Sequence, residues 1–372
     1  MSYWGENILQ FDPRAEEEKR EIRSAANRCG IILILMLVFM YIISFGMSAL
    51  VGIFRDQILG ISKDINLWNA VFSVVMNLLV YAVLVPVLLL ICNRASGTRV
   101  AEYLRWPEIP GREMGKLLLM GLGVTYMASY TGNILYNAAN LLLQQLFGIT
   151  MQSPDVSVER NPVSIAVLIL GTAILAPFFE ELLVRCGLVG ILRKYGCWFT
   201  AIATGVLFGF LHTSFSQVFF AMMMGIYAGF IAHRTRSVWP SILLHITVNG
   251  ISVVQVILLS FADVDGLEYL LNSYQSMEPR QFLQELQGMA GSLLPLAAVQ
   301  LIGIGVLVLG IVGIVKLVKE IGRHPRQFNP RESSVLKLPE KLKAFFTAPA
   351  VLVFFALSIL LSLYNAFPFP IG

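Results

Sequence analysis

Long apolar runs separated by short polar stretches are the dominant pattern along the chain. A helix that crosses a bilayer needs about 20 mostly apolar residues, and nine runs approach or exceed that length. They are roughly residues 31–54, 69–92, 116–148, 163–192, 198–214, 217–232, 239–261, 291–318 and 347–366. The third run is long for a single span and contains Asn133, Asn137 and Asn140, so we expect it to tilt, to extend beyond the bilayer or to break.

The composition strengthens this interpretation. Of the 372 residues, 56% are hydrophobic and only 13% are charged, and the mean hydropathy is +0.73. Soluble globular domains of ordinary composition are far less apolar. We therefore predict an all-α fold, a polytopic membrane helix bundle with about nine transmembrane spans and a range of about eight to ten.

The positions of the basic residues predict an orientation. If the N-terminus is cytosolic and there are nine spans, the inner segments hold all but five of the 27 lysines and arginines. The exceptions are Arg55, Lys63, Arg160 and Arg280 on outer segments and Arg185 within a span. This bias satisfies the positive-inside rule. The net charge of +4 is then an orientation signal and no sign of nucleic-acid binding. We expect an integral protein of the plasma membrane, in contact with the lipid bilayer.

The same pattern divides the chain into five parts. Residues 1–30 form a polar cytosolic leader that is too long for a signal peptide, and we favour a solvated tail over an amphipathic helix there. The other parts are N-terminal spans at 31–162, a core with the candidate chemistry at 163–261, an acidic and partly helical outer loop at 262–290, and C-terminal spans at 291–372. The four cysteines show neither metal-ligand spacing nor a disulfide framework.

Two adjacent carboxylates and an arginine interrupt the fourth apolar run. Glu181 and Arg185 are four residues apart, so they share a helix face and can form an ion pair. Glu180 points about 100° away from Glu181 and is left to face something else. Pro177 removes a backbone donor and should kink or restart the helix. Ionisable groups at membrane depth usually mark function, although the Glu181–Arg185 pair by itself is also compatible with a structural bridge between spans.

Two histidines lie in later apolar runs, each with a companion four residues away. Phe208 and His212 place an aromatic ring beside an imidazole, and His245 and Asn249 place an imidazole and a carboxamide on one helix face. Each polar residue taken singly is compatible with a hydrogen bond to a neighbouring helix. From the inner membrane face, Glu180 would lie roughly 20 Å deep, His212 roughly 21 Å, and His245 and Asn249 roughly 9–15 Å. The set could therefore meet in one pocket.

Such a pocket would be equipped for amide hydrolysis. A buried glutamate and a neutral imidazole can deprotonate water, and a second imidazole with an amide can stabilise the oxyanion. One carboxylate and two imidazoles also resemble a hydrolytic zinc site, although the helix signature H-E-x-x-H is absent. A G-x-S-x-G serine elbow is absent as well.

Three motifs follow one another in the order Glu180-Glu181-x-x-x-Arg185, Phe208-x-x-x-His212 and His245-x-x-x-Asn249. This order resembles the CPBP family, the CAAX-protease and bacteriocin-processing (Abi) group of intramembrane endopeptidases. The resemblance covers about residues 163–255, and the remaining spans match only in being hydrophobic. It makes residues 163–261 a CAAX-protease-like catalytic core.

The resemblance also implies a role for each motif residue. Glu180 and His212 would activate the hydrolytic water, and His245 with Asn249 would hold the oxyanion. The supporting residues would be Glu181 and Arg185, which keep the shape of the site, and Phe208, which lines the pocket. The family is often labelled metalloprotease, yet its eukaryotic-type members are also described as glutamate-dependent and metal-free. The resemblance therefore leaves both a metal-free site and a zinc site open.

The sequence thus predicts an intramembrane endopeptidase that hydrolyses a peptide bond in a membrane-associated peptide or protein. Two other functions fit the same pocket. One is a non-catalytic immunity or membrane chaperone protein that binds a peptide. The other is a proton-coupled transporter in which Glu180 and the histidines relay protons. The sequence shows no inverted repeat or paired broken helices of the kind many transporters have.

Overall fold

A computed structural model of the protein describes residues 12–63, 65–97, 100–153, 158–328 and 334–367. The described residues fold into helices and include no β-strand. Seven helical segments are long and apolar enough to cross a membrane. They are Pro13–Ile53 (α1), Leu67–Arg94, Pro162–Tyr195, Phe215–Thr235 (α11), Trp239–Ser260 (α12), Ala290–Arg323 (α15) and Pro349–Ala366 (α18). The predicted polytopic helix bundle is confirmed.

Two further helices coincide with the other two predicted apolar runs. The helix α6 (Gly111–Phe147) has 37 residues, and α10 (Cys197–Leu211) is an apolar helix of 15 residues. Each of the nine predicted apolar runs therefore lies within a helical segment, apart from at most three residues at its ends, while the total of nine spans stays a prediction. The helix α6 runs without a break. Asn140, near its C-terminal end, accepts a hydrogen bond at Oδ1 from the backbone N–H of Met151, which follows the helix, over 2.7 Å. Of the expected alternatives, a break in this helix is wrong.

The polar leader is part of the bundle. The helix α1 begins at Pro13, directly after the N-cap residue Asp12, and Ile22, Ala25 and Cys29 on its first turns are fully buried. A solvated tail is therefore wrong for residues 13–30, because these turns pack against other helices. Residues 1–11 lie outside the described part of the chain.

Small residues set the close packing around the centre of the bundle. A Cβ atom on Gly205 of α10 would lie 2.3 Å from the backbone nitrogen of Ile226 in α11. A Cβ atom on Gly123 of α6 would lie 2.6 Å from the backbone of Gly313 in α15. Membrane helices commonly use such small residues to bring their backbones together. The close contact of α10 with α11 positions the end of α10, where His212 lies.

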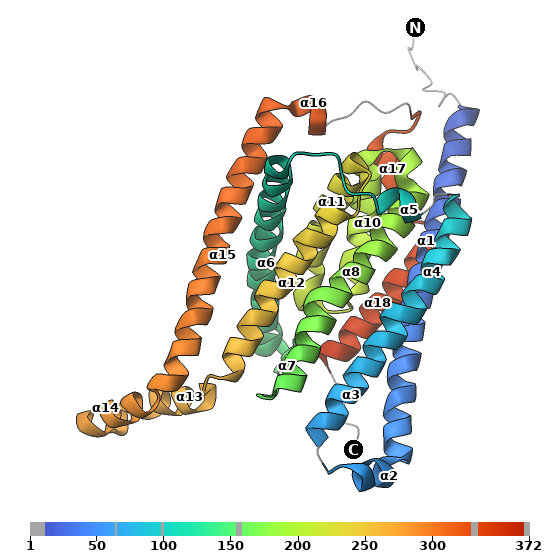
Figure 1. The fold of residues 1–372 in the computed structure, drawn as a ribbon. Coiled ribbons are helices and arrows are strands. Elements are labelled where there is room, and N and C mark those ends of the chain that lie inside the picture. Colours follow the sequence, from blue (N-terminus) through green and yellow to red (C-terminus); the bar gives the residue numbers. More distant parts are fainter. Residues whose placement is uncertain (1–11, 64, 98–99, 154–157, 329–333, 368–372) are drawn as a thin grey trace.

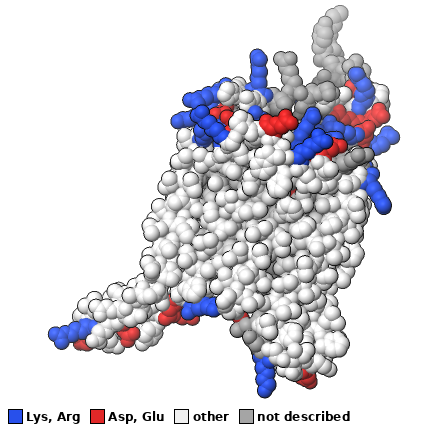
Figure 2. All heavy atoms as spheres, viewed as in Figure 1, with Lys and Arg blue, Asp and Glu red and all other residues white. Residues whose placement is uncertain are grey.

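Shorter helices cover the two ends of the bundle (Figure 1). At one end, α13 (Val264–Ser273) and α14 (Pro279–Gly288) lie across the helix axes, flanking the short η5 (Tyr274–Ser276), as expected for a partly helical outer loop. The remaining short helices are α2 (Arg55–Ile61), α5 (Val100–Tyr103), α16 (Pro325–Phe328) and α17 (Leu338–Phe346). Figure 2 shows the charged side chains gathered at both ends, with a broad uncharged band between them.

Candidate active site

The first motif lies on a helix whose backbone changes type several times. Residues 162–195 comprise α7 (Pro162–Leu168), the π-helical η2 (Ile169–Leu175), α8 (Ala176–Glu181), the π-helical η3 (Leu182–Leu188), α9 (Val189–Leu192) and the 3₁₀ turn η4 (Arg193–Tyr195). Pro177 lies in the first turn of α8, so the α-helix restarts there as predicted. The residues of α8, including both glutamates, thus lie between two π-helical segments, a feature that is frequent at functional sites.

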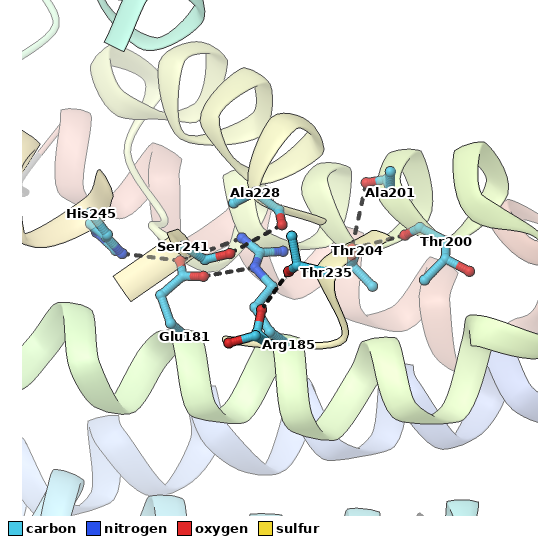
Figure 3. Close-up of polar contacts among 10 residues, drawn as sticks. Glu181, Arg185, Thr200, Ala201, Thr204, Ala228, Thr235, Ser241 and His245 are labelled. Atoms are coloured by element: carbon cyan, nitrogen blue, oxygen red, sulfur yellow. Dashed lines mark hydrogen bonds and ion pairs between the residues drawn. The ribbon is translucent and has the colours of Figure 1, made fainter. Parts of the chain in front are cut away.

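Glu181 and Arg185 form an ion pair with no exposed side-chain surface. The Nε atom of Arg185 lies 2.7 Å from Oε2 of Glu181, and one terminal nitrogen lies 3.4 Å from Oε1. His245 joins the pair, because its Nδ1 lies 3.1 Å from Oε1 of Glu181 (Figure 3). We call these three residues the buried ion cluster. The expected pairing of Glu181 with Arg185 is therefore present. Through His245, the cluster connects α12 to the helix at residues 162–195, which we call the motif helix.

The contacts of His245 fix the hydrogen positions on its ring. An ionised carboxylate only accepts hydrogen bonds, so Nδ1 of His245 carries the hydrogen that it shares with Glu181. In the neutral ring the other nitrogen, Nε2, is then an acceptor.

Glu180 and His212 face a different space from the buried ion cluster. Both line a cavity of about 410 Å³, together with side chains from α1 and from the π-helical η1 (Leu78–Leu84), which connects α3 (Ile65–Asn77) to α4 (Val85–Ser96). The other lining residues are Met36, Leu37, Met40, Tyr41, Ser44, Met76, Val80, Tyr81, Leu211 and Thr213. We call this space the Glu180 cavity. Its three methionines give it an adaptable apolar wall.

His212 is oriented for accepting a proton. Its Nδ1 lies 2.9 Å from the carbonyl oxygen of Phe208, one turn earlier in α10. A carbonyl oxygen only accepts, so Nδ1 donates and Nε2 of the neutral ring keeps a free lone pair. His212 and Glu180 are both half-buried and line the same cavity. The imidazole Nε2 and the carboxylate can therefore each accept a hydrogen bond on the wall of this cavity.

Phe208 lies between the two histidines. Its ring makes edge contacts with His212, at 4.8 Å between centroids, and with His245, at 5.7 Å. The guanidinium carbon of Arg185 lies 5.5 Å from the same ring. Phe208 is 1% exposed and is not among the described residues that line the Glu180 cavity. It packs behind His212 and links the cavity to the buried ion cluster.

Three polar residues of α12, namely Ser241, His245 and Asn249, follow one face at four-residue intervals. Ser241 donates to the carbonyl oxygen of Ala228 over 3.1 Å, His245 contacts Glu181, and the Asn249 amide donates to the carbonyl oxygen of Thr172 over 3.0 Å. His245 and Asn249 thus share a face, as their spacing predicts, and both meet the motif helix. Among the described residues, neither lines the Glu180 cavity.

The structure also brings residues to the Glu180 cavity that the sequence analysis passed over. Tyr41 and Tyr81 come from earlier spans, and Thr213 directly follows His212. A polar aromatic residue inside an apolar run is a usable sequence signal, and it would have found both tyrosines. Thr213 offers no such signal. What distinguishes it is a left-handed backbone with φ of 46°, which the tertiary structure decides and a threonine in the sequence does not reveal.

The donor set does not fit a zinc site. The described residues contain no group of three or more His, Cys, Asp or Glu side chains placed to hold a metal ion. The two motif histidines belong to different surroundings, His212 to the Glu180 cavity and His245 to the buried ion cluster. All four cysteines are buried and are free thiols.

Comparison with known proteins agrees with the motifs. Residues 162–251 match the family model described as Type II CAAX prenyl endopeptidase Rce1-like, and this segment contains all three motifs. A Bacillus subtilis (strain 168) protein named "Putative membrane peptidase YdiL" is 23% identical over 143 residues, which are 38% of this chain and 57% of that protein. No solved structure matches the chain at a significant level. The predicted resemblance to the CPBP proteases is confirmed for the core of this membrane protein.

Proposed function

We propose that this protein is an intramembrane endopeptidase that cleaves a membrane-associated peptide or protein with water activated by Glu180 and His212. The observation that carries the proposal is the opposite placement of the two adjacent glutamates. Glu181 is neutralised within the buried ion cluster, whereas Glu180 lines a cavity together with a histidine whose Nε2 is an acceptor. One carboxylate is thereby available for chemistry while its neighbour holds the structure.

The reaction needs one water molecule between the two acceptors. Glu180 or Nε2 of His212 takes a proton from that water as its oxygen attacks the carbonyl carbon of the scissile peptide bond. The tetrahedral intermediate carries an oxyanion. The family resemblance assigns His245 and Asn249 to it, but both side chains contact the helix at 162–195 and neither lines the Glu180 cavity, so a donor on the cavity wall is still needed. The C–N bond then breaks, and the proton held by the glutamate–histidine pair passes to the departing amine. Atoms and charge balance without a covalent enzyme intermediate.

The lining of the Glu180 cavity favours an apolar peptide segment as the substrate. Its walls are mainly apolar and come from α1, η1 and the end of α10, all within the bundle. Methionines fill irregular gaps and tolerate different partners, which suits a site that binds varied apolar side chains. Water activation by the carboxylate and the imidazole also agrees with the absence of a fitting metal-ligand group among the described residues. The shared placement of Glu180 and His212 on one cavity supports the proposal of a glutamate-type peptidase.

The test compares wild-type protein with Glu180→Gln in cells that lack the natural protein. Membrane proteins from both are analysed by mass spectrometry for new N-termini, and candidate substrates are then cleaved by the purified protein in lipid nanodiscs. Glu180→Gln keeps the size of the side chain and removes the base, so we expect a loss of cleavage of about 10²–10⁴-fold. Glu268→Gln, the same change at an exposed position of α13, is the matched control and should cleave like wild type.

Termini that appear equally with wild-type protein and Glu180→Gln would overturn the proposal. If Glu180→Gln also kept the biological activity of the protein, a non-catalytic peptide-binding role would take its place. In either case the variant must accumulate in the membrane at the wild-type level, which the nanodisc preparation measures directly.

A further inference from the structure

A hydrogen-bond network from the last span reaches the Glu180 cavity. Asn365 of α18 donates from its amide nitrogen to the backbone oxygen of Thr213 over 2.9 Å, and the same nitrogen lies 3.4 Å from the Thr213 hydroxyl. It also lies 3.5 Å from the hydroxyl of Tyr41 in α1. Tyr41 and Thr213 both line the cavity that holds Glu180 and His212. Three elements far apart in sequence thus meet at one wall.

The Thr213 end of this network holds a strained turn beside the candidate catalytic histidine. His212 ends α10, and Thr213 follows with φ of 46°, in the left-handed region that β-branched residues rarely adopt. Such a residue persists only where its surroundings enforce the conformation. The bond from Asn365 to the Thr213 carbonyl is one such constraint. Asn365 lies outside residues 162–251, so the motif segment alone does not contain it.

The Tyr41 end of the network leaves a hydroxyl hydrogen free to donate. An amide nitrogen is only a donor, so in the contact with Asn365 the Tyr41 oxygen accepts. Its own O–H is then directed elsewhere. Because Tyr41 is half-buried and lines the Glu180 cavity, the substrate carbonyl is the acceptor that the cavity would bring to it.

The proposed reaction requires a hydrogen-bond donor for the oxyanion, and the Tyr41 hydroxyl can be this donor. An oxyanion is stabilised by donors placed about 2.7–3.1 Å from the oxygen that develops the charge. His245 uses its Nδ1 hydrogen on Glu181 and does not line the Glu180 cavity. Asn249 uses one amide hydrogen on Thr172 and keeps one. Tyr41 of α1 has a hydroxyl and lines the same cavity as Glu180 and His212, the two groups that would activate the water.

We propose that the Tyr41 hydroxyl donates a hydrogen bond to the substrate carbonyl oxygen as it becomes the oxyanion, and that Asn365 is the positioning residue for this hydroxyl and for the turn after His212. The inference rests on the proposed peptidase function. No covalent bond forms at Tyr41, and its proton stays on the phenol throughout. The donor acts on charge that develops in the transition state, so its effect belongs in kcat rather than in KM.

Tyr41→Phe tests the donor, because it removes the hydroxyl and keeps the ring. With a cleaved substrate in nanodiscs, we expect kcat to fall about 100-fold, as for the loss of one oxyanion donor, with KM within about twofold of wild type. Tyr364→Phe is the matched control, because Tyr364 is 47% exposed on α18 and directly precedes Asn365. It should keep wild-type kcat.

Asn365→Ala tests the positioning role. We expect it to lower kcat about tenfold by itself and to add less than that in a Tyr41→Phe background, because residues that act as one unit are not additive. A merely structural Asn365 would instead lower stability and leave the kcat of the folded fraction unchanged. Folded fractions are compared through the four buried cysteines, which react with a thiol dye only after unfolding.

Glu180→Gln in the same assay separates the two proposals. If Glu180→Gln is inactive and Tyr41→Phe keeps wild-type kcat, the donor is overturned and the peptidase function stands. A rise in KM at unchanged kcat overturns it as well, since it would show ground-state binding only. If Glu180→Gln still cleaves, the peptidase mechanism falls and this inference falls with it.

Discussion

Glu180 and Glu181 are adjacent in sequence and lie in opposite kinds of surroundings. Glu181 has no exposed surface, and its carboxylate is shared between Arg185 at 2.7 Å and His245 at 3.1 Å. Glu180 is half-buried and lines a cavity of about 410 Å³ with His212. A buried charge must be paired, whereas a carboxylate at a cavity can exchange protons with water. The same kind of side chain thus serves structure at one position and, in the proposed mechanism, chemistry at the next.

The largest effect should come from breaking the buried ion cluster. Glu181→Leu leaves Arg185 charged and buried without its carboxylate, which should lower the free energy of unfolding by about 3–5 kcal/mol. The double variant Glu181→Leu/Arg185→Leu removes both charges and should recover much of that loss. Thermal unfolding of the purified variants, followed with a thiol dye, measures both.

An exposed ion pair provides the control for burial. Lys194 and Glu21 lie 2.5 Å apart, with 59% and 49% of their side chains exposed. Lys194→Met should therefore change the free energy of unfolding by no more than about 1 kcal/mol. A loss as large as that of Glu181→Leu would contradict the importance of burial.

A medium effect is expected where the two regions touch. Phe208 contacts His212 on the cavity side and Arg185 and His245 on the buried side. Phe208→Leu should lower the free energy of unfolding by about 1–3 kcal/mol and also lower kcat, because the ring supports both histidines. Unfolding and cleavage are measured on the same preparation. If stability falls while kcat is unchanged, Phe208 serves only the buried ion cluster.

The smallest effect on stability is expected at Glu180, the residue on which the proposed cleavage depends most. Glu180→Gln should change the free energy of unfolding by no more than about 0.5 kcal/mol, because no ion pair to Glu180 is present among the described residues and the side chain keeps its size. Thermal unfolding of this variant beside Glu181→Leu makes the comparison direct. A strong destabilisation would show that Glu180 also holds the bundle together.

Local spacing explains which parts of the site could be predicted. Glu181 and Arg185 pair because four residues bring two side chains to one helix face, and this holds wherever the helix lies. The same rule placed His245 with Asn249, but it could not name their partners. Glu181 and Thr172 are those partners, and both lie on another helix.

Interactions between distant segments explain the errors. The charged N-terminal turns read as a solvated tail in isolation, yet Glu18 accepts hydrogen bonds from the Ser334 hydroxyl and from the backbone N–H of Val335 and Leu336, and Glu21 pairs with Lys194. A polar pattern does not reveal partners more than 150 residues away. For the long run at 116–148, the continuous helix α6 excludes the break, one of the three alternatives that the sequence left open.

The sequence by itself determined the membrane bundle, the helical runs and the motif pair Glu181–Arg185. Each depends on apolar length or on the fixed repeat of a helix, both of which act within one segment. Only the tertiary structure decided that Glu180 and His212 share a cavity, that His245 completes the buried ion cluster, and that Asn365 joins Tyr41 to Thr213. Those contacts depend on how close and at what rotation the helices pack, which is set by side chains from many segments at once.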